Sequence, residues 1–131
     1  MSRYWFVLTG LLGALGVALA AWSAHGLHAF VPPDQLADAM EKARSASVQH
    51  MLHTLALFGV ALWARQGRNA WGHLAGILFF LGVLGFSGGI YGLRLVAGIN
   101  EGPLIYIVPW GGTCLILGWL ALAVAGWRER D

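Results

Sequence analysis

Charged residues divide this chain into four long uncharged runs, and this division constrains the fold more than any other feature. The runs cover residues 4–33, 45–64, 69–93 and 102–127. A helix needs about 20 apolar residues to cross the hydrocarbon core of a bilayer, and each run is long enough. Only helices and closed barrels satisfy the backbone in lipid, and the runs lack the alternation that is typical of strands.

We therefore predict an all-α protein that is an integral membrane four-helix bundle. The expected helices span about 4–24, 46–64, 71–93 and 103–126. Apolar residues make up 58% of the chain and charged residues only 11%, whereas soluble domains carry about 25% charged residues. Disorder is excluded because disordered chains are poor in aromatic residues, and this chain has seven Trp, six Phe and three Tyr.

The positions of Lys and Arg predict the orientation, because cytoplasmic loops carry an excess of both. With the N-terminus inside, five basic residues fall on the cytoplasmic side and three on the outer side. The five are Arg3, Arg65, Arg68, Arg128 and Arg130, and the three are Lys42, Arg44 and Arg94. We expect both termini in the cytoplasm. The basic residues form no dense cluster, so we expect no nucleic-acid partner.

The segment 33–45 differs from the spans because it carries five charged residues. Leu36, Met40 and Ala43 would share one apolar face of a helix there. We expect a short amphipathic helix on the outer side, between the first two spans.

The fourth span contains a proline followed by two glycines. Proline inside a helix removes a backbone hydrogen bond, and sharp kinks concentrate at such positions. We expect a kink or a break formed by Pro109, Gly111 and Gly112.

Polar side chains are concentrated in the outer half of the predicted bundle. Two histidine pairs have i, i+3 spacing, so each pair can share a helix face. Polar groups in lipid usually face the bundle interior and find partners there. The candidate network or ligand-binding residues are His25, Gln49, His53, Ser87, Tyr91 and Arg94. The candidate metal ligands are His25, His28, His50 and His53.

Three interpretations of this cluster stay open. The side chains can hydrogen-bond across helices and fix the packing. The two histidine pairs can face one metal ion or a haem, because neutral imidazole is a common ligand of transition metals. Alternatively, Arg94 can be the charged partner of a small anion or a lipid head group in a polar pocket.

Several short motifs along the chain carry a resemblance to a known family. They are Ala24-His25-Gly26, Gln49 with His53-Thr54-Leu55-Ala56, Phe86-Ser87-Gly88 with Tyr91, and Pro109, Gly111, Gly112, Gly118 and Trp119. On these residues almost the whole chain resembles the small bacterial inner-membrane proteins catalogued as domain of unknown function 423, the YgdD-like proteins.

The resemblance implies four membrane helices and no established activity. It also implies a shared polar core that looks like a hydrogen-bond network. That core is His25, Gln49, His53, Ser87 and Tyr91, and the family pattern does not call for histidine at the positions of His28 and His50.

We expect a non-enzymatic structural or interaction protein of the bacterial inner membrane, because no nucleophile, base and orienting group occur together. No cofactor is expected. The expected partners are the lipid bilayer and either other membrane proteins or a second copy of the chain. The alternative is a protein that binds a metal, a haem or a small ligand at the outer histidines. A small transporter ranks third, because Leu57, Val60 and Ala64 offer no polar path on the inner side.

Overall fold

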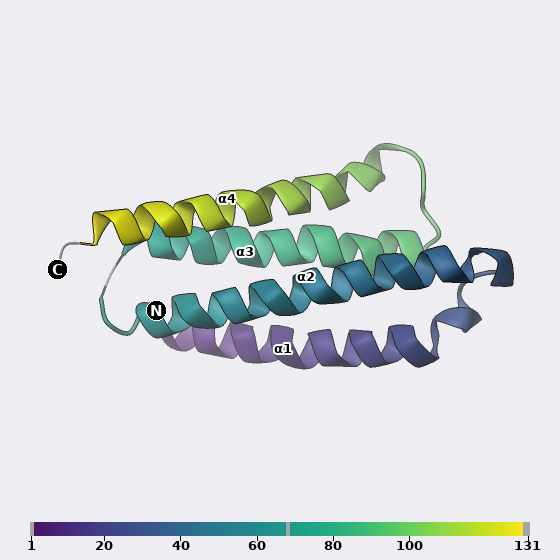
Figure 1. Cartoon of the computed structure of the whole chain (residues 1–131), viewed down its shortest axis with the longest axis horizontal. Coiled ribbons are helices and arrows are strands. Elements are labelled where there is room, and N and C mark those ends of the chain that lie inside the picture. Colours follow the sequence, from purple (N-terminus) through teal and green to yellow (C-terminus); the bar gives the residue numbers. More distant parts are fainter. Residues whose placement is uncertain (1, 68, 130–131) are drawn as a thin grey trace.

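The computed structural model describes residues 2–67 and 69–129, and the regular structure of these residues is entirely helical. Four long helices run back and forth along one axis (Figure 1). They are α1 (Ser2–His25), α2 (Leu36–Trp63), α3 (Ala70–Gly88) and α4 (Ile107–Arg128). The predicted all-α four-helix fold is confirmed. Arg68 and Arg130, which the orientation argument counts, lie outside the described residues.

The start of α1 and the end of α4 lie at the same end of the molecule (Figure 1). We call the opposite end, which holds the connections 26–35 and 97–106, the outer end. Two 3-10 turns there, Leu27–Ala29 and Pro33–Gln35, join α1 to α2, and a third, Pro103–Tyr106, leads into α4.

A π-helical segment, Gly89–Val96, extends α3 toward the outer end. In a π-helix each N–H bonds to the carbonyl five residues back, so the turns are wider than in an α-helix. At the end of the segment the Ala97 N–H still donates in this way, to the Gly92 carbonyl at 3.0 Å. Such segments are rare and mostly a single turn long, and they occur frequently at functional sites. Eight residues of π-helix therefore mark this end of the bundle as unusual.

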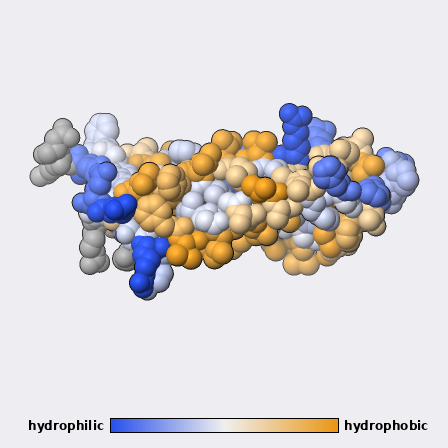
Figure 2. Space-filling model, turned by 90° about the horizontal axis from the view of Figure 1, so that it is seen from below, coloured by the Kyte–Doolittle hydropathy of each residue, from blue (hydrophilic) through white to orange (hydrophobic). Residues whose placement is uncertain are grey.

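Within residues 2–67 and 69–129, three helices are long and apolar enough to cross a membrane. They are α1, the continuous stretch Ala70–Val96, and Pro103–Arg128. Figure 2 shows hydrophilic side chains gathered at the two ends of the molecule, with mainly apolar or neutral surface between them. In α2 the charged residues end at Arg44, and residues 45–63 extend about 28 Å at the helical rise, close to the thickness of the hydrocarbon core.

The amphipathic helix expected at 33–45 is not a separate element. After the turn Pro33–Gln35, the chain enters α2, which continues without interruption to Trp63. No Gly or Pro occurs between Leu36 and Phe58, so no residue ends the helix between its charged and apolar parts. The buried stripe also differs from the expected one, because Ala39, Ala43 and Ala46 face the core and Met40 is exposed.

A break in the helix does not occur at Pro109, Gly111 and Gly112, because α4 passes through all three residues. Pro109 lies in the first turn of α4, where its missing N–H would have no helical partner. A Cβ atom on Gly111 would overlap the backbone of Gly85 and Phe86. This glycine therefore lets α3 and α4 approach closely, as small residues do in membrane bundles.

The four helices contribute unequally to the core. Half of the most apolar window of α3 is buried, compared with 28% in α4 and 11% in α1. The buried apolar side chains form three clusters along the bundle. Representative members are Leu27, Ile90 and Leu95 at the outer end, Leu12, Leu57 and Leu115 in the middle, and Val60 and Phe79 toward the other end. Of these three stretches, the one that contains α3 is therefore the most buried, and α1 presents the widest face to the surroundings.

Candidate functional site

Among the residues that the structure describes, four polar side chains are buried in the bundle, namely His50, His53, Thr54 and Ser87. Ser87 Oγ on α3 donates to the Ala46 carbonyl on α2 at 2.8 Å. Tyr91, on the π-helical segment, donates to the Ala43 carbonyl on α2 at a longer 3.5 Å. These two hydrogen bonds connect α3 and its π-helical extension to α2.

His53 links α2 to α4. Its Nε2 accepts a hydrogen bond from Trp119 Nε1 at 3.0 Å, and its Nδ1 lies 2.8 Å from the Gln49 carbonyl. Because an indole N–H only donates and a carbonyl only accepts, the arrangement fits a neutral imidazole with its proton on Nδ1. Phe79 packs against both the His53 and the Trp119 ring, at centroid distances of 5.6 and 5.1 Å.

His50 links α2 to α1. Its Nε2 lies 2.9 Å from the Leu12 carbonyl, so this nitrogen carries a proton and donates. The Thr54 hydroxyl donates to the His50 carbonyl at 2.8 Å. A Cβ on Gly16 would lie 3.1 Å from the His50 ring, and Gly16 therefore allows the imidazole to reach the α1 backbone.

Gln49 contributes to this network through its backbone carbonyl. Its side chain lines a groove of about 310 Å³ beside His53, between α2 and α4. The other lining residues are Phe86, Gly112, Leu115, Ile116 and Trp119.

The structure does not bring the four predicted metal ligands together. Although residues three apart on a helix point only about 60° apart, His50 contacts the Leu12 carbonyl on α1 and His53 contacts Trp119 on α4. His25 and His28 are exposed, because α1 ends at His25 and the following turn buries Leu27 instead. Across residues 2–67 and 69–129, no three His, Cys, Asp or Glu side chains are grouped as a metal ion would require.

Arg94 lines a polar hollow of about 120 Å³ at the outer end, which we call the outer pocket, and no histidine is among its lining residues. The Nε atom of Arg94 is buried and has no hydrogen-bond partner among the described residues. The polar residues that line the outer pocket are Gln35, Asp38, Lys42, Arg94 and Asn100. The predicted set is therefore divided: Gln49, His53, Ser87 and Tyr91 lie at helix contacts, Arg94 lies in the outer pocket, and His25 belongs to neither.

Trp119 and the other polar residues that line the outer pocket were missed as site residues by sequence reasoning. An indole N–H in the middle of a membrane-spanning helix needs an acceptor from the protein, because lipid offers none, which was an available signal for Trp119. The acceptor itself lies 66 residues away in the chain, and the sequence does not identify it. A second such pair occurs near the other end, where Trp5 Nε1 donates to His73 Nδ1 at 3.0 Å.

Comparison with known proteins identifies relatives along the whole chain. A family described as a protein of unknown function, DUF423, matches residues 19–112. A UPF0382 membrane protein of Haemophilus influenzae is 32% identical over 131 residues, which is 100% of this chain and 99% of the relative. The UPF0382 membrane protein YwdK of Bacillus subtilis is 36% identical over 92% of this chain and 94% of its own.

The UPF0382 inner membrane protein YgdD of Escherichia coli is 27% identical over 98% of this chain and 93% of its own. No solved structure matches the chain. The family match covers most of the sequence and the relatives align over almost their full lengths, so the chain belongs to the DUF423 family, whose members are named UPF0382 membrane proteins.

Proposed function

We propose that this chain is a non-enzymatic structural or interaction protein of the bacterial inner membrane, with an accessory role toward other membrane components. One observation carries the proposal. The buried polar side chains His50, His53, Thr54 and Ser87 are each engaged within the bundle. General acid–base or nucleophilic catalysis needs such a group within reach of a reacting atom. Here His50, His53 and Ser87 connect helices instead, and Thr54 bonds within α2.

The same bonds weigh against a metal or a haem at the histidines. An imidazole ligates through a nitrogen lone pair, and the Nε2 lone pair of His53 already accepts the Trp119 N–H. Nε2 of His50 carries the proton that it shares with the Leu12 carbonyl. Ligation through either of these nitrogens would therefore break a hydrogen bond between helices.

We also propose that all four helices cross the membrane, with both termini in the cytoplasm. The antiparallel order of the helices and the uncharged length of α2 support four crossings, and the excess of Lys and Arg supports the orientation. A cysteine-labelling experiment tests this, in a Cys114→Ser background, with Gln66→Cys and Glu101→Cys as single sites. A membrane-impermeant maleimide on intact cells should label Glu101→Cys and spare Gln66→Cys. The reverse labelling pattern would show that the orientation is the opposite one. Equal labelling of the two cysteines would show that the chain does not cross the membrane between residues 66 and 101.

Photo-crosslinking in living cells tests the interaction role. The chain offers matched neighbours: Leu11 on α1 is 65% exposed and Leu12 is 5% exposed, and on α4 Ile116 is 63% exposed and Leu115 is 5% exposed. A crosslinking amino acid at Leu11 or Ile116 should give one discrete protein adduct, either a second copy or another membrane protein. The buried positions should give none. Lipid adducts alone at both exposed positions would exclude the interaction role.

A further inference from the structure

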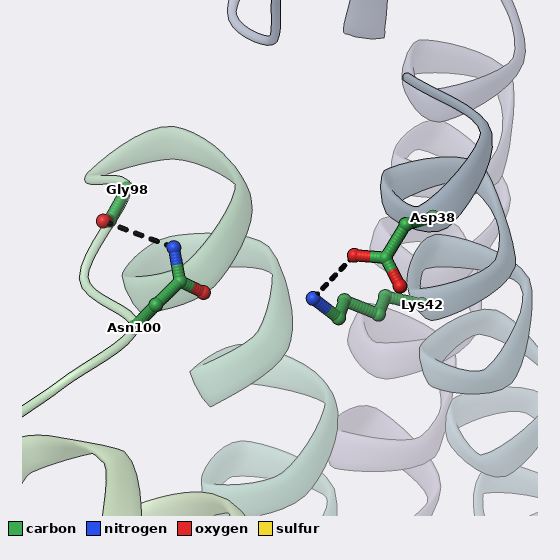
Figure 3. Close-up of polar contacts among 4 residues, drawn as sticks. All are labelled: Asp38, Lys42, Gly98 and Asn100. Atoms are coloured by element: carbon green, nitrogen blue, oxygen red, sulfur yellow. Dashed lines mark hydrogen bonds and ion pairs between the residues drawn. The ribbon is translucent and has the colours of Figure 1, made fainter. Parts of the chain in front are cut away.

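The outer pocket is a concave site built from segments that lie far apart in the sequence. The start of α2 supplies Asp38 and Lys42, the π-helical segment supplies Arg94, and the connection after it supplies Asn100. Figure 3 shows Lys42 extending from α2 toward the ribbon that carries Gly98 and Asn100. The volume of about 120 Å³ compares with about 30 Å³ for each molecule of liquid water, so the pocket has room for a small polar group.

The charges around the outer pocket are unbalanced in favour of positive charge. Asp38 pairs with Lys42 at 2.6 Å. No carboxylate among the described residues lies within ion-pair distance of Arg94. Arginine stays protonated under all ordinary conditions, so two cations and one carboxylate border the hollow. Its electrostatic character therefore suits an anion.

Arg94 also has unused donor capacity. Its Nε is buried without a partner, and a buried charged donor that lacks a partner is unfavourable in free energy. The guanidinium group donates in a planar fork that matches the oxygens of a phosphate group. The missing partner is therefore an acceptor, and an anionic one is favoured.

The backbone that presents Arg94 is specialised. Arg94 lies in the π-helical segment, whose turns are wider than those of an α-helix. Leu95, which is 3% exposed, anchors this segment in the core. In the connection that follows, Asn100 donates from its Nδ2 to the Gly98 carbonyl at 3.2 Å.

We propose that the outer pocket binds the phosphate group of an anionic ligand, with Arg94 as the principal donor and with Lys42 and Asn100 beside it. Two sources offer this chemistry, namely the phosphodiester of an anionic lipid head group and dissolved inorganic phosphate. Phe30, at the rim of the pocket, is 52% exposed, so apolar surface adjoins the polar hollow. This inference is independent of the proposed accessory role, and either can fail without the other.

Binding is tested on the whole protein, purified in detergent and stripped of lipid. Native mass spectrometry measures retention of phosphatidylglycerol against neutral diacylglycerol, and the melting temperature is recorded with and without inorganic phosphate. The wild type should retain phosphatidylglycerol or be stabilised by inorganic phosphate. Stabilisation by phosphate together with displacement of the lipid assigns the pocket to free phosphate, and retention of lipid in the presence of phosphate assigns it to the head group. If neither probe binds, the proposal is overturned.

Variants locate the binding. Arg94→Met removes the donors, and its affinity for the bound probe should fall about tenfold or more, as for the loss of a charge-assisted hydrogen bond. Arg94→Lys keeps the charge without the fork and should give an intermediate affinity. The matched control is Arg44→Met, because Arg44 is an exposed cation on α2 that does not line the outer pocket.

Equal losses in Arg94→Met and Arg44→Met would indicate nonspecific attraction and overturn the proposal. If Arg94→Met fails to fold, Asn100→Asp provides the second variant. It changes an exposed loop residue and adds a negative charge to the pocket, so binding should weaken by a similar factor. Unchanged binding by Asn100→Asp would overturn the proposal as well.

Discussion

His53 and Arg94 are both polar side chains on packed helices, and they differ in whether the fold supplies a partner. Both ring nitrogens of His53 have hydrogen-bond partners, one on α2 and one on α4. The Nε of Arg94 is buried and has none among the described residues. The histidine lies among apolar side chains such as Phe79, and the arginine lies beside a hollow at one end of the bundle.

The difference follows from the solvent around each region. In the middle of a membrane no water can complete an unmet hydrogen bond, so polar side chains there mostly find a partner in the bundle. Thr9 on α1 is an exception, because its hydroxyl oxygen is buried without a hydrogen-bond partner among the described residues. At the end of the bundle, water or a ligand can enter a pocket. The hydrogen bonds of His50, His53 and Ser87 are therefore made to other parts of the bundle. The Arg94 side chain, in contrast, lies beside a pocket that a partner from outside the protein can enter. Four substitutions test this comparison, in order of decreasing effect.

Gly111→Ala should have the largest effect on stability because it forces α3 and α4 apart. The added Cβ would overlap the backbone of Gly85 and Phe86, and backbone cannot rotate away as a side chain can. We expect a loss of about 3 kcal/mol in the free energy of unfolding, at the upper end for overpacking, measured by unfolding in mixed detergent micelles. Gly126→Ala on the same helix is the control, because a Cβ there has no neighbour within 4 Å. Equal stability of the two variants would contradict the close contact of α3 and α4.

His53→Ala should have the next largest effect. It leaves a cavity beside Phe79 and removes the acceptor of the Trp119 N–H. We expect a loss of about 2 kcal/mol, since a cavity and an unmet buried donor each contribute. Trp119→Phe should cost about 1 kcal/mol alone and much less in the His53→Ala background. Strictly additive losses in this double-mutant cycle would show that the bond between α2 and α4 does not stabilise the fold.

Ser87→Ala should have a smaller effect of the same kind. It removes a single hydrogen bond from α3 to the Ala46 carbonyl, and such bonds in membrane proteins average about 0.6 kcal/mol. Thr113→Ala is the control, because the Thr113 hydroxyl donates within α4 and is exposed. Its unfolding free energy should stay within error of the wild type. A larger loss in Thr113→Ala than in Ser87→Ala would contradict the importance of buried bonds between helices.

The sequence was sufficient to predict the four helices because lipid sets their length and composition. The uncharged runs correspond to α1, the later part of α2, α3 and α4. Length and hydropathy do not determine how a helix is rotated about its axis, because that depends on packing against neighbours. The histidine spacing therefore predicted two shared faces, whereas His50 and His53 contact different helices.

The outer pocket could not be predicted from the sequence for a related reason. Arg94 was selected from its position near the end of a span, but its surroundings depend on the π-helical segment Gly89–Val96. In that segment each side chain points in a different direction around the helix axis than it would in an α-helix. The α-helical period of 3.6 residues per turn therefore predicts the wrong direction for the Arg94 side chain. The break predicted at Pro109 was wrong because of where α4 begins. Proline breaks a helix only where an N–H is needed, and the start of α4 at Ile107 removed that need.

Arg94→Met should have the smallest effect in the absence of anions and the sharpest one in their presence. Since Arg94 Nε is buried without a hydrogen-bond partner among the described residues, Arg94→Met removes an unfavourable donor, and the unfolding free energy in phosphate-free, lipid-stripped micelles should not fall below that of the wild type. Addition of a bound anion at a hundredfold excess over its dissociation constant should stabilise the wild type by about 2.7 kcal/mol. His53→Ala should gain the same increment, because its pocket is intact, and Arg94→Met should gain almost none. If Arg94→Met lost as much stability without anion as His53→Ala, Arg94 would be part of the closed network and the two regions would not differ.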